Sequence, residues 1–321
     1  MKKALIFSAR GLKSFTLDQI KLLQQSLDVR FVSCMKPLSP TRFIQLAGPY
    51  SVLGFTRRTI KDLNREMIDQ LPSLREVAIY ATGYEWVDSA YLAAKGIKLS
   101  YLPDYSSASV AEHAMGCLLV LSRRIQLSFD RTRGIAPPWV SLRGWELKGK
   151  NLGLIGFGRI GKKIAGLASA FGMKVFVADR KKTGHRNQVS LRRLLCVSDA
   201  VVLTSSQERG GGAVLGRANF SWVRPGAVLV NVGRADLVDH GALLPLLRSK
   251  KINGYAVDGD VEILRRAKGV EPGRILQTAH TGWYSNEAMK RGTQTWVENL
   301  TAFGRGQSRN RVRLKVKREN K

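Results

Sequence analysis

The stretch Asn151-Leu152-Gly153-Leu154-Ile155-Gly156-Phe157-Gly158-Arg159-Ile160-Gly161 decides the fold of this chain. Its apolar start predicts a buried strand, its glycines predict a tight turn, and the residues 162–171 that follow have the pattern of a helix. A second apolar stretch, 174–178, ends at Asp179. A strand, a Gly-x-Gly-x-x-Gly turn, a helix, a strand and an acidic residue about twenty positions on form the pattern of a dinucleotide-binding unit.

The three glycines of this turn have separate roles in such a unit. Gly156 permits the tight turn, Gly158 lets backbone amides approach a pyrophosphate, and Gly161 lets the helix pack close to the strand. The helix N-terminus adds unpaired N–H groups and partial positive charge, so Arg159 and Ile160 there join the predicted cofactor contacts. The alternative is a glycine-rich turn in an α/β protein that binds no nucleotide.

The acidic residue after the second strand bears on which dinucleotide binds. Asp179 is placed to accept hydrogen bonds from an adenosine ribose, which favours NAD over NADP. Arg180, Lys181 and Lys182 follow directly and could accommodate a 2′-phosphate, so NADP stays open as an alternative.

The length and composition set the broad class of the protein. At 321 residues the chain has room for about two domains, each with its own core. No stretch approaches the ~18 apolar residues of a membrane span, and residues 4–7 suit a first strand better than a signal peptide. The three cysteines are far apart and show no metal-binding or disulfide spacing, so we expect a cytoplasmic protein without a metal.

The formal net charge of +29 is unusual for such a protein. Residues 305–321 hold a basic tail, whose alternating stretch 311–317 suits either an edge strand or a disordered arm, but most of the charge lies elsewhere. Such a field attracts polyanions at low salt. Because no nucleic-acid-binding module is recognisable, we expect only non-specific binding of nucleic acid through the charge.

Strand and helix patterns alternate through residues 1–103, which predicts a mostly parallel sheet. One helix is expected to open with a capping box at 16–19, and another to cover 61–71. A second capping-box pattern at 109–112 predicts the start of a long helix that runs to about residue 127.

The alternation continues after the nucleotide turn. Five or six strands are expected from residue 151 onward, enough for a complete doubly wound sheet. A glycine-rich loop is expected at 210–212, and a last helix with one apolar face over 283–303.

Three polar residues follow predicted strands in this second half. Arg234 comes after the strand 227–232, Asp258 after the strand 253–257, and His280 after a strand that begins near residue 274. Ligands of open α/β sheets bind at the carboxyl ends of the strands. An arginine can hold a carboxylate and a histidine can move a proton, so the two suit the oxidation of a hydroxy acid beside a nicotinamide. Alternatively, each is an ordinary surface residue.

Further motifs lie along nearly the whole chain: Ala81-Thr82-Gly83-Tyr84-Glu85-Trp86-Val87-Asp88, Ser109-Val110-Ala111-Glu112-His113, Pro225-Gly226 through Arg234, Leu237-Val238-Asp239 and Ala256-Val257-Asp258. Together with the nucleotide turn and His280, they resemble the D-isomer-specific 2-hydroxyacid dehydrogenase family. Residues 280–285 are most similar to its C-terminal-binding-protein branch, whose members are NAD-binding corepressors. His113 itself is interpreted as a packing or hydrogen-bonding residue.

The resemblance implies the fold and the domain organisation. It implies a Rossmann-type doubly wound NAD-binding domain over 104–283, and a flavodoxin-like substrate domain formed by 1–103 together with 284–321. It also implies a homodimer through the nucleotide-binding domains.

The resemblance implies the roles of the residues as well. His280 would exchange the hydroxyl proton of the substrate, and Arg234 would hold its carboxylate and carbonyl with help from the backbone amides of Thr82 and Gly83. Trp283 would line the substrate pocket. Further cofactor contacts would come from Thr204, Val232 and Gly233, and from Asp258, which would hold the nicotinamide carboxamide.

Two positions depart from the family pattern. The family's catalytic glutamate corresponds to Ile263, and a shift of one residue would let Glu262 take its role of orienting His280. Glu271-Pro272 mimics the family's Glu-Pro pair, but it aligns better with the turn before the last strand. Thr204 and Ser206 stand where the family has a His or Cys and a Pro beside the adenosine.

The leading hypothesis is an NAD(H)-dependent oxidoreductase that interconverts a D-2-hydroxy acid and its 2-keto acid. The alternative is a dinucleotide-binding regulatory or scaffold protein of the corepressor type with little or no turnover. The missing glutamate favours the alternative, whereas Arg234 and His280 favour the enzyme.

Overall fold

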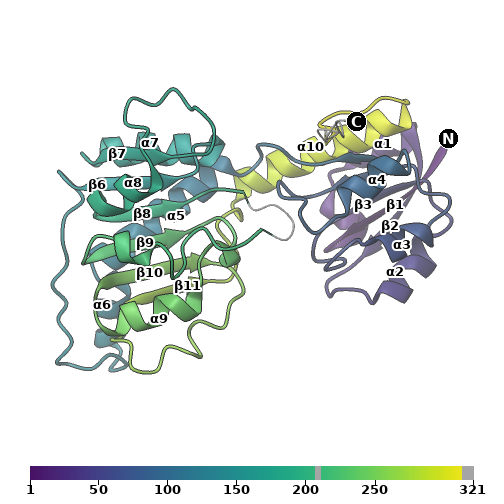
Figure 1. Ribbon diagram of the computed structural model, residues 1–321. Helices are drawn as coiled ribbons and strands as arrows, with labels where there is room; N and C mark the ends of the chain where they lie inside the picture. The colour runs from purple at the N-terminus through teal and green to yellow at the C-terminus, as the bar shows by residue number, and fades with distance from the viewer. Residues whose placement is uncertain (207–210, 313–321) are drawn as a thin grey trace. The chain divides into compact units, whose positions relative to one another are not determined.

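The computed structural model describes residues 1–206 and 211–312, and the chain forms two compact units (Figure 1). The first unit combines Met1–Tyr105 with Asn286–Lys321, and the second is Ser106–Ser285. Both boundaries lie two residues after the expected ones.

The first unit contains a five-stranded parallel sheet in the order β2-β1-β3-β4-β5. This is the flavodoxin-like order, as the resemblance implied. The strands are β1 Lys2–Ser8, β2 Leu27–Ser33, β3 Val52–Phe55, β4 Glu76–Ile79 and β5 Lys98–Ser100. The helices are α1 Leu17–Ser26, α2 Pro40–Ala47, α3 Arg65–Asp69, α4 Ser89–Ala94 and α10 Asn286–Gly304, with a 3-10 turn at Gly11–Ser14.

Helix α10 joins this unit from the far end of the chain because its apolar face packs on the sheet. Trp296 is buried, and its indole Nε1 donates a hydrogen bond to the carbonyl of Ala78 at 2.9 Å. One turn earlier, a Cβ on Gly292 would lie 2.4 Å from the Tyr80 hydroxyl, so only glycine fits there. Sequence distance is therefore no guide to which unit this helix belongs to.

The chain after α10 pairs with the open edge of this sheet. Arg311 forms an antiparallel bridge with Ser100, and the Val312 amide donates to the Leu99 carbonyl at 2.8 Å. The first part of the predicted tail is therefore an edge segment. The remainder, 313–321, lies outside the described residues.

The second unit contains a six-stranded parallel sheet in the order β11-β10-β9-β8-β6-β7. Gln188 forms an isolated parallel bridge with Val177 on the outer edge of β7. The strands are β6 Asn151–Ile155, β7 Lys174–Ala178, β8 Ala200–Leu203, β9 Ala227–Asn231, β10 Ile252–Asp258 and β11 Ile275–Thr278. The helices are α5 Ser107–Ser122, α6 Ile125–Thr132, α7 Arg159–Ala170, α8 Leu191–Val197 and α9 His240–Arg248, with 3-10 turns at Phe220–Trp222 and Ala235–Leu237.

Each face of this sheet has its own hydrophobic core. Helices α5 and α7 cover one face, where Ala114, Leu118 and Ile164 are fully buried. Helices α8 and α9 cover the other, around Leu194 and Leu243. A parallel sheet covered by helices on both faces confirms the expected doubly wound domain.

The structure confirms some of the expected helix starts and corrects others. Thr16 and Gln19 form the predicted capping box at the start of α1. The second expected box is wrong, because α5 begins at Ser107 and Ser109 lies inside it. The long helix also ends early: Arg124 has a left-handed backbone (φ 57°), which separates α5 from α6.

Two other expectations are also corrected, and one helix was not expected. The helix expected over 61–71 covers only Arg65–Asp69, because the Asn64 side chain caps it at its start. Helix α2 has no counterpart in the expected elements, although Ser39 and Pro40 begin it in the usual way. The helix after the nucleotide turn begins at Arg159 rather than 162. The glycine loop at 210–212 falls partly outside the described residues.

Over the described residues, no helix is both long enough and apolar enough to cross a membrane. Cys34, Cys117 and Cys196 are all free thiols.

Candidate functional site

The turn between β6 and α7 has the geometry that a bound pyrophosphate requires. Gly156 has a left-handed backbone (φ 95°), and a Cβ there would lie 2.7 Å from the Ser205 amide nitrogen. A Cβ on Gly161 would lie 2.5 Å from the Gly156 carbonyl oxygen, whereas Gly158 has nothing within 4 Å. The first and third glycines therefore close the turn, while the second leaves open space at the helix start.

The N-terminus of α7 has no side-chain cap. Gly158 is the N-cap and offers no side chain to the first amides of the helix. Arg159 is exposed at the first position, and Ile160 is half-buried at the second. Open space, a helix start without a side-chain cap and a nearby cation are what a dinucleotide pyrophosphate needs, so these residues fit the predicted cofactor.

Asp179 lies directly after β7 and contacts the same turn. Its Oδ2 accepts a hydrogen bond from the Phe157 amide at 2.8 Å, and its Oδ1 accepts one from the Lys181 amide at 2.9 Å. The carboxylate is half-buried. Two amide donors leave further acceptor positions on the two oxygens, so Asp179 retains capacity for ribose hydroxyls.

The loop after β8 lies against the glycine turn. The Thr204 hydroxyl donates to the Gly156 carbonyl at 2.9 Å, so this side chain stabilises the turn. The neighbouring Ser205 hydroxyl is buried, and no partner is found for it within the described part of the chain. A Cβ on Gly233 would lie 3.1 Å from the Ser205 carbonyl oxygen. This unsatisfied hydroxyl lies between two segments predicted to contact the cofactor, and nothing in the sequence pattern pointed to it.

Asn231, the last residue of β9, shapes the segment that carries Arg234. The side chain of Asn231 is buried; its Oδ1 accepts from the Gly233 amide at 3.1 Å, and its Nδ2 donates to the Arg234 carbonyl at 2.9 Å. Val232 is buried beside it, and Arg234 is half-buried. A polar residue at the end of an apolar strand was the available signal for Asn231, which was not among the predicted site residues.

Asp258, the last residue of β10, holds the turn that contains His280. Its Oδ1 accepts from the Thr278 hydroxyl at 2.7 Å and from the Thr281 amide at 2.8 Å, and its Oδ2 accepts from the Gly282 amide at 2.8 Å. His280 has a left-handed backbone (φ 55°), a conformation that costs a non-glycine residue about 1–3 kcal/mol. Asp258 therefore contacts both residues that follow His280.

The strand order brings these three residues to one edge of the sheet. β9, β10 and β11 are adjacent and parallel, and Arg234, Asp258 and His280 lie at or after their carboxyl ends. The glycine turn after β6 opens at the same edge. Trp283, predicted to line the substrate pocket, is partly buried against the core under α5 and α7.

Glu262 and Glu271 are the two candidates for the role of the family's glutamate, and their environments differ. Glu262 is largely exposed, with a side-chain exposure of 72%, and pairs with Arg265 at 2.8 Å. It lines a hollow of about 580 Å³ together with Thr278 and Ala279, immediately before His280. Ile263, at the family position, is buried in the core.

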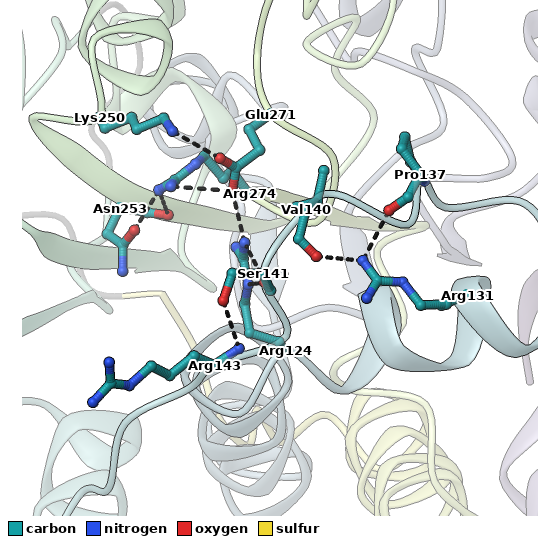
Figure 2. A network of polar contacts seen from close by, with 10 residues as sticks. All are labelled: Arg124, Arg131, Pro137, Val140, Ser141, Arg143, Lys250, Asn253, Glu271 and Arg274. Carbon is teal, nitrogen blue, oxygen red and sulfur yellow. Dashed lines mark hydrogen bonds and ion pairs between the residues drawn. The ribbon is translucent and has the colours of Figure 1, made fainter.

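Glu271 lies at the opposite end of β11 from His280. Its carboxylate is bound by Arg124 at 2.6 Å, by Arg274 at 3.1 Å and by Lys250 at 3.0 Å (Figure 2). Burial raises the pKa of Glu271, but the bonds from Arg124 and Lys250 and the charge of Arg274 outweigh it, so the pKa falls to about 2. Glu271 is therefore an ion-pair residue at the end of β11 that is remote from His280.

Thr82 and Gly83 belong to the first unit, where they follow β4. The Thr82 hydroxyl donates to the Leu102 carbonyl at 2.8 Å, and the Gly83 carbonyl accepts from the Trp86 indole at 3.0 Å. The loop is therefore held by the side chain of Thr82 and the carbonyl of Gly83.

The fold and the strand-end residues define a dinucleotide-binding oxidoreductase of the doubly wound class. Residues 115–282 match the family described as "D-isomer specific 2-hydroxyacid dehydrogenase, NAD binding domain". The chain belongs to this family, whose members interconvert 2-hydroxy and 2-keto acids with NAD. No cluster of metal-ligating side chains was found within the described ranges.

Individual relatives agree with this assignment. A glyoxylate reductase from Pyrococcus furiosus is 30% identical over 76% of this chain and 77% of its own. A hydroxypyruvate reductase from Blautia hydrogenotrophica is 30% identical over 78% of this chain and 82% of its own. The crystal structure of a putative D-isomer specific 2-hydroxyacid dehydrogenase from Polaromonas superposes with a TM-score of 0.80 at 26% identity, over 98% and 100% of the two chains. Because the named relatives are enzymes, the corepressor-type alternative is not favoured.

Proposed function

We propose that this protein reduces a small 2-keto acid, glyoxylate or hydroxypyruvate, to the corresponding 2-hydroxy acid with NADH. The observation that carries the proposal is the placement of Arg234 after β9 and His280 after β11, on either side of β10, at the sheet edge where the glycine turn opens. The relatives named for glyoxylate and hydroxypyruvate support the choice of substrate.

The residues of the chain have separate tasks in this reaction. The nicotinamide, when bound, supplies the hydride. Arg234 binds the substrate carboxylate through its planar guanidinium, aided by the amides of Thr82 and Gly83. His280 donates a proton to the oxygen of the keto group as it becomes a hydroxyl. Trp283 limits the size of the substrate side chain.

The cofactor is assigned to the residues around the glycine turn. Gly156, Gly158 and Gly161, with Arg159 and Ile160, hold the pyrophosphate, and Asp179 holds the adenosine ribose. Thr204, Val232, Gly233 and Asp258 complete the site. Asp179 favours NADH, and the Asp179→Ala variant is expected to raise the preference for NADPH, since the basic residues 180–182 would remain.

The test is an assay of purified protein with NADH or NADPH and a panel of 2-keto acids. Glyoxylate and hydroxypyruvate should oxidise the nicotinamide fastest, with pyruvate and branched or aromatic keto acids slower. His280→Ala and Arg234→Ala should each lower kcat/KM by about a hundredfold or more. Binding of NADH without turnover of any keto acid would overturn the proposal.

The role of Glu262 can be tested in the same assay. We propose that it orients and stabilises the charged form of His280, which directly follows Thr278 and Ala279 on the wall of the hollow that Glu262 lines. Glu262→Gln would then shift the pH profile of kcat/KM to lower pH, because the imidazolium loses a stabilising charge. Asp260→Asn, on the same hollow, is the matched control. An unchanged profile in Glu262→Gln would remove Glu262 from the mechanism.

We propose that two copies associate through the segment that contains α6. Large apolar side chains are exposed along this segment, namely Ile125 (51%), Phe129 (54%), Ile135 (61%) and Trp139 (81%). A second copy is the simplest partner for such a surface, and the family resemblance implies a dimer through this domain. Light scattering should give twice the mass of the chain, and Phe129→Ser with Trp139→Ser should give monomers. A wild-type monomer would refute this.

We also propose a cytoplasmic location, on the ground that all three cysteines are free. Binding of nucleic acid is expected to be non-specific and to disappear by physiological salt, because it depends on bulk charge.

A further inference from the structure

A line of polar side chains links α5 to the segment that contains His280. Ser109 and His113 lie four residues apart and therefore on one face of α5. The Ser109 hydroxyl lies 2.7 Å from the Ser285 hydroxyl, and His113 Nε2 lies 3.1 Å from the Thr278 hydroxyl. The two contacts fall on either side of the turn at His280, so α5 supports this turn before and after it.

The direction of the hydrogen bonds follows from the single proton of the threonine. The Thr278 hydroxyl donates to Asp258 Oδ1 at 2.7 Å, so it can only accept from His113. His113 Nε2 must then carry a proton and donate it to Thr278. The bonds run in one direction, from His113 to Thr278 and from Thr278 to Asp258, whose two oxygens accept the Thr281 and Gly282 amides.

The packing of the turn requires glycine at position 282. A Cβ on Gly282 would lie 2.8 Å from Asp258 Oδ2 and 3.2 Å from His113 Cδ2. A side chain at position 282 would therefore clash with both the carboxylate and the imidazole. The left-handed conformation of His280 lies directly before these captured amides, which keep it from relaxing to an ordinary backbone.

We propose that His113, Thr278 and Asp258 form a clamp that positions His280 for proton transfer. The three are positioning residues, and the inference rests on the proposed function only in giving His280 the proton. On this view the first task of Asp258 is to bind the two amides after His280. The three donors from the chain occupy most of its acceptor capacity, about four lone-pair sites, which leaves room for at most one contact with the cofactor.

The clamp predicts a specific kinetic effect. Thr278→Val keeps the shape of the side chain but removes both of its hydrogen bonds, so the turn loses its link to α5 through His113 while the Ser109–Ser285 contact remains. A displacement of His280 by about 1 Å would lower kcat by about tenfold to a hundredfold. Binding of NADH should change by less than about threefold, because the glycine turn is untouched. Thr278→Ser keeps the hydroxyl and should restore most of kcat.

Two controls separate positioning from a general loss of packing. Thr301→Val removes a buried hydroxyl that bonds only within α10, at 2.9 Å from the Val297 carbonyl, and should leave kcat unchanged. His113→Gln places an amide N–H close to the position of Nε2 and should retain more activity than His113→Leu. Equal kcat in Thr278→Val and the wild type, or an equal loss in Thr301→Val, would overturn the clamp.

Hydrogen exchange tests the clamp without reference to catalysis. The amides of Thr281 and Gly282 should exchange slowly in the wild-type protein, because Asp258 binds both. In Thr278→Val they should exchange at least about tenfold faster, while the Val177 amide in β7 stays as it was. If both turn amides exchange fast in the wild type, the clamp is wrong even if the enzyme turns over. If no keto acid is reduced but the amides behave as expected, only the proposed function fails.

Discussion

A carboxylate lies at each end of β11, buried in the case of Asp258 and half-buried in the case of Glu271, but the partners differ in kind. At the amino end, Glu271 is surrounded by the charged side chains of Arg124, Lys250 and Arg274 (Figure 2). At the carboxyl end, Asp258 accepts hydrogen bonds from one hydroxyl and two backbone amides. Charged side chains neutralise a carboxylate and connect elements, whereas backbone amides let a carboxylate determine the shape of a turn. The ion pairs of Glu271 stabilise the fold, whereas the bonds to Asp258 fix the turn that carries the His280 side chain.

Both ends hold residues in a conformation that normally requires glycine. Arg124 (φ 57°) and Lys250 (φ 64°) contact Glu271, and His280 (φ 55°) precedes the amides bound by Asp258. Asn310 is the remaining non-glycine residue with a positive φ in the described part of the chain. At each end of β11 a left-handed residue therefore lies close to a carboxylate that binds its side chain or the backbone next to it.

The largest effect is expected from Asp258→Asn. This substitution replaces one carboxylate oxygen by an NH₂ group, which is a donor and cannot accept a hydrogen bond from the backbone N–H group opposite. The turn would lose at least one of its bonds, and kcat should fall by about a hundredfold, equivalent to about 2.7 kcal/mol in the barrier. Steady-state kinetics at saturating NADH measures this. If only the affinity for NADH falls, Asp258 serves the cofactor alone and the proposed contrast between the two ends is wrong.

The next effect is on stability and belongs to the other end of the strand. Glu271→Gln leaves two buried arginines without their counter-charge, so the free energy of unfolding should fall by about 2 kcal/mol. Since this cluster is remote from His280, kcat should be unchanged. Urea unfolding and kinetics of the same variant test both statements. Glu262→Gln, in an exposed pair with Arg265, should change stability by less than about 0.5 kcal/mol.

The pH dependence of this stability has a definite sign. The pKa of Glu271 is lowered from 4.5 to about 2 in the folded protein. The ion pairs therefore stabilise fully above pH 4.5, and their contribution is lost as the pH falls through about 2. The difference in unfolding free energy between wild type and Glu271→Gln should shrink over this range. A difference that stays constant down to pH 2 would contradict the ion-pair origin.

The sequence was sufficient to predict the βα alternation and the nucleotide turn, because hydrophobic period and glycine spacing are local signals. It was also sufficient to place Arg234, Asp258 and His280 after strands. The strand order that makes these strands neighbours, and so groups the three residues at one edge, depends on how the sheet assembles. It entered the predictions only through the family resemblance.

Long-range hydrogen bonds were the part that local patterns could not supply. His113 was interpreted as a packing or hydrogen-bonding residue, but its partner Thr278 is 165 positions away. The break between α5 and α6 was missed because arginine, the residue at position 124, has a high intrinsic helix propensity. Its left-handed backbone accompanies a contact with Glu271, 147 positions away.

A smaller effect, in the opposite direction, is expected from His280→Gly. Glycine adopts the left-handed conformation without strain, so the free energy of unfolding should rise by about 1 kcal/mol although activity is lost. Thermal unfolding of the two proteins measures it. Ala279→Gly is the control, since Ala279 has no positive φ and glycine there should only destabilise. A loss of stability in His280→Gly would mean that the turn is not strained.

The smallest effect is expected at Lys250, the left-handed residue beside Glu271 at the amino end of β11. Lys250→Gly removes the same kind of strain as His280→Gly, but it also removes a half-exposed ion pair with Glu271 that contributes at most about 1 kcal/mol. The two terms oppose each other, so the net change in unfolding free energy should lie within about 0.5 kcal/mol. Lys250→Ala keeps the strain and loses the pair, and should be less stable than Lys250→Gly by about 1 kcal/mol. If His280→Ala and His280→Gly differ by the same amount, the backbone strain is equal at both ends of β11. The difference between the ends would then lie entirely in what the two carboxylates bind.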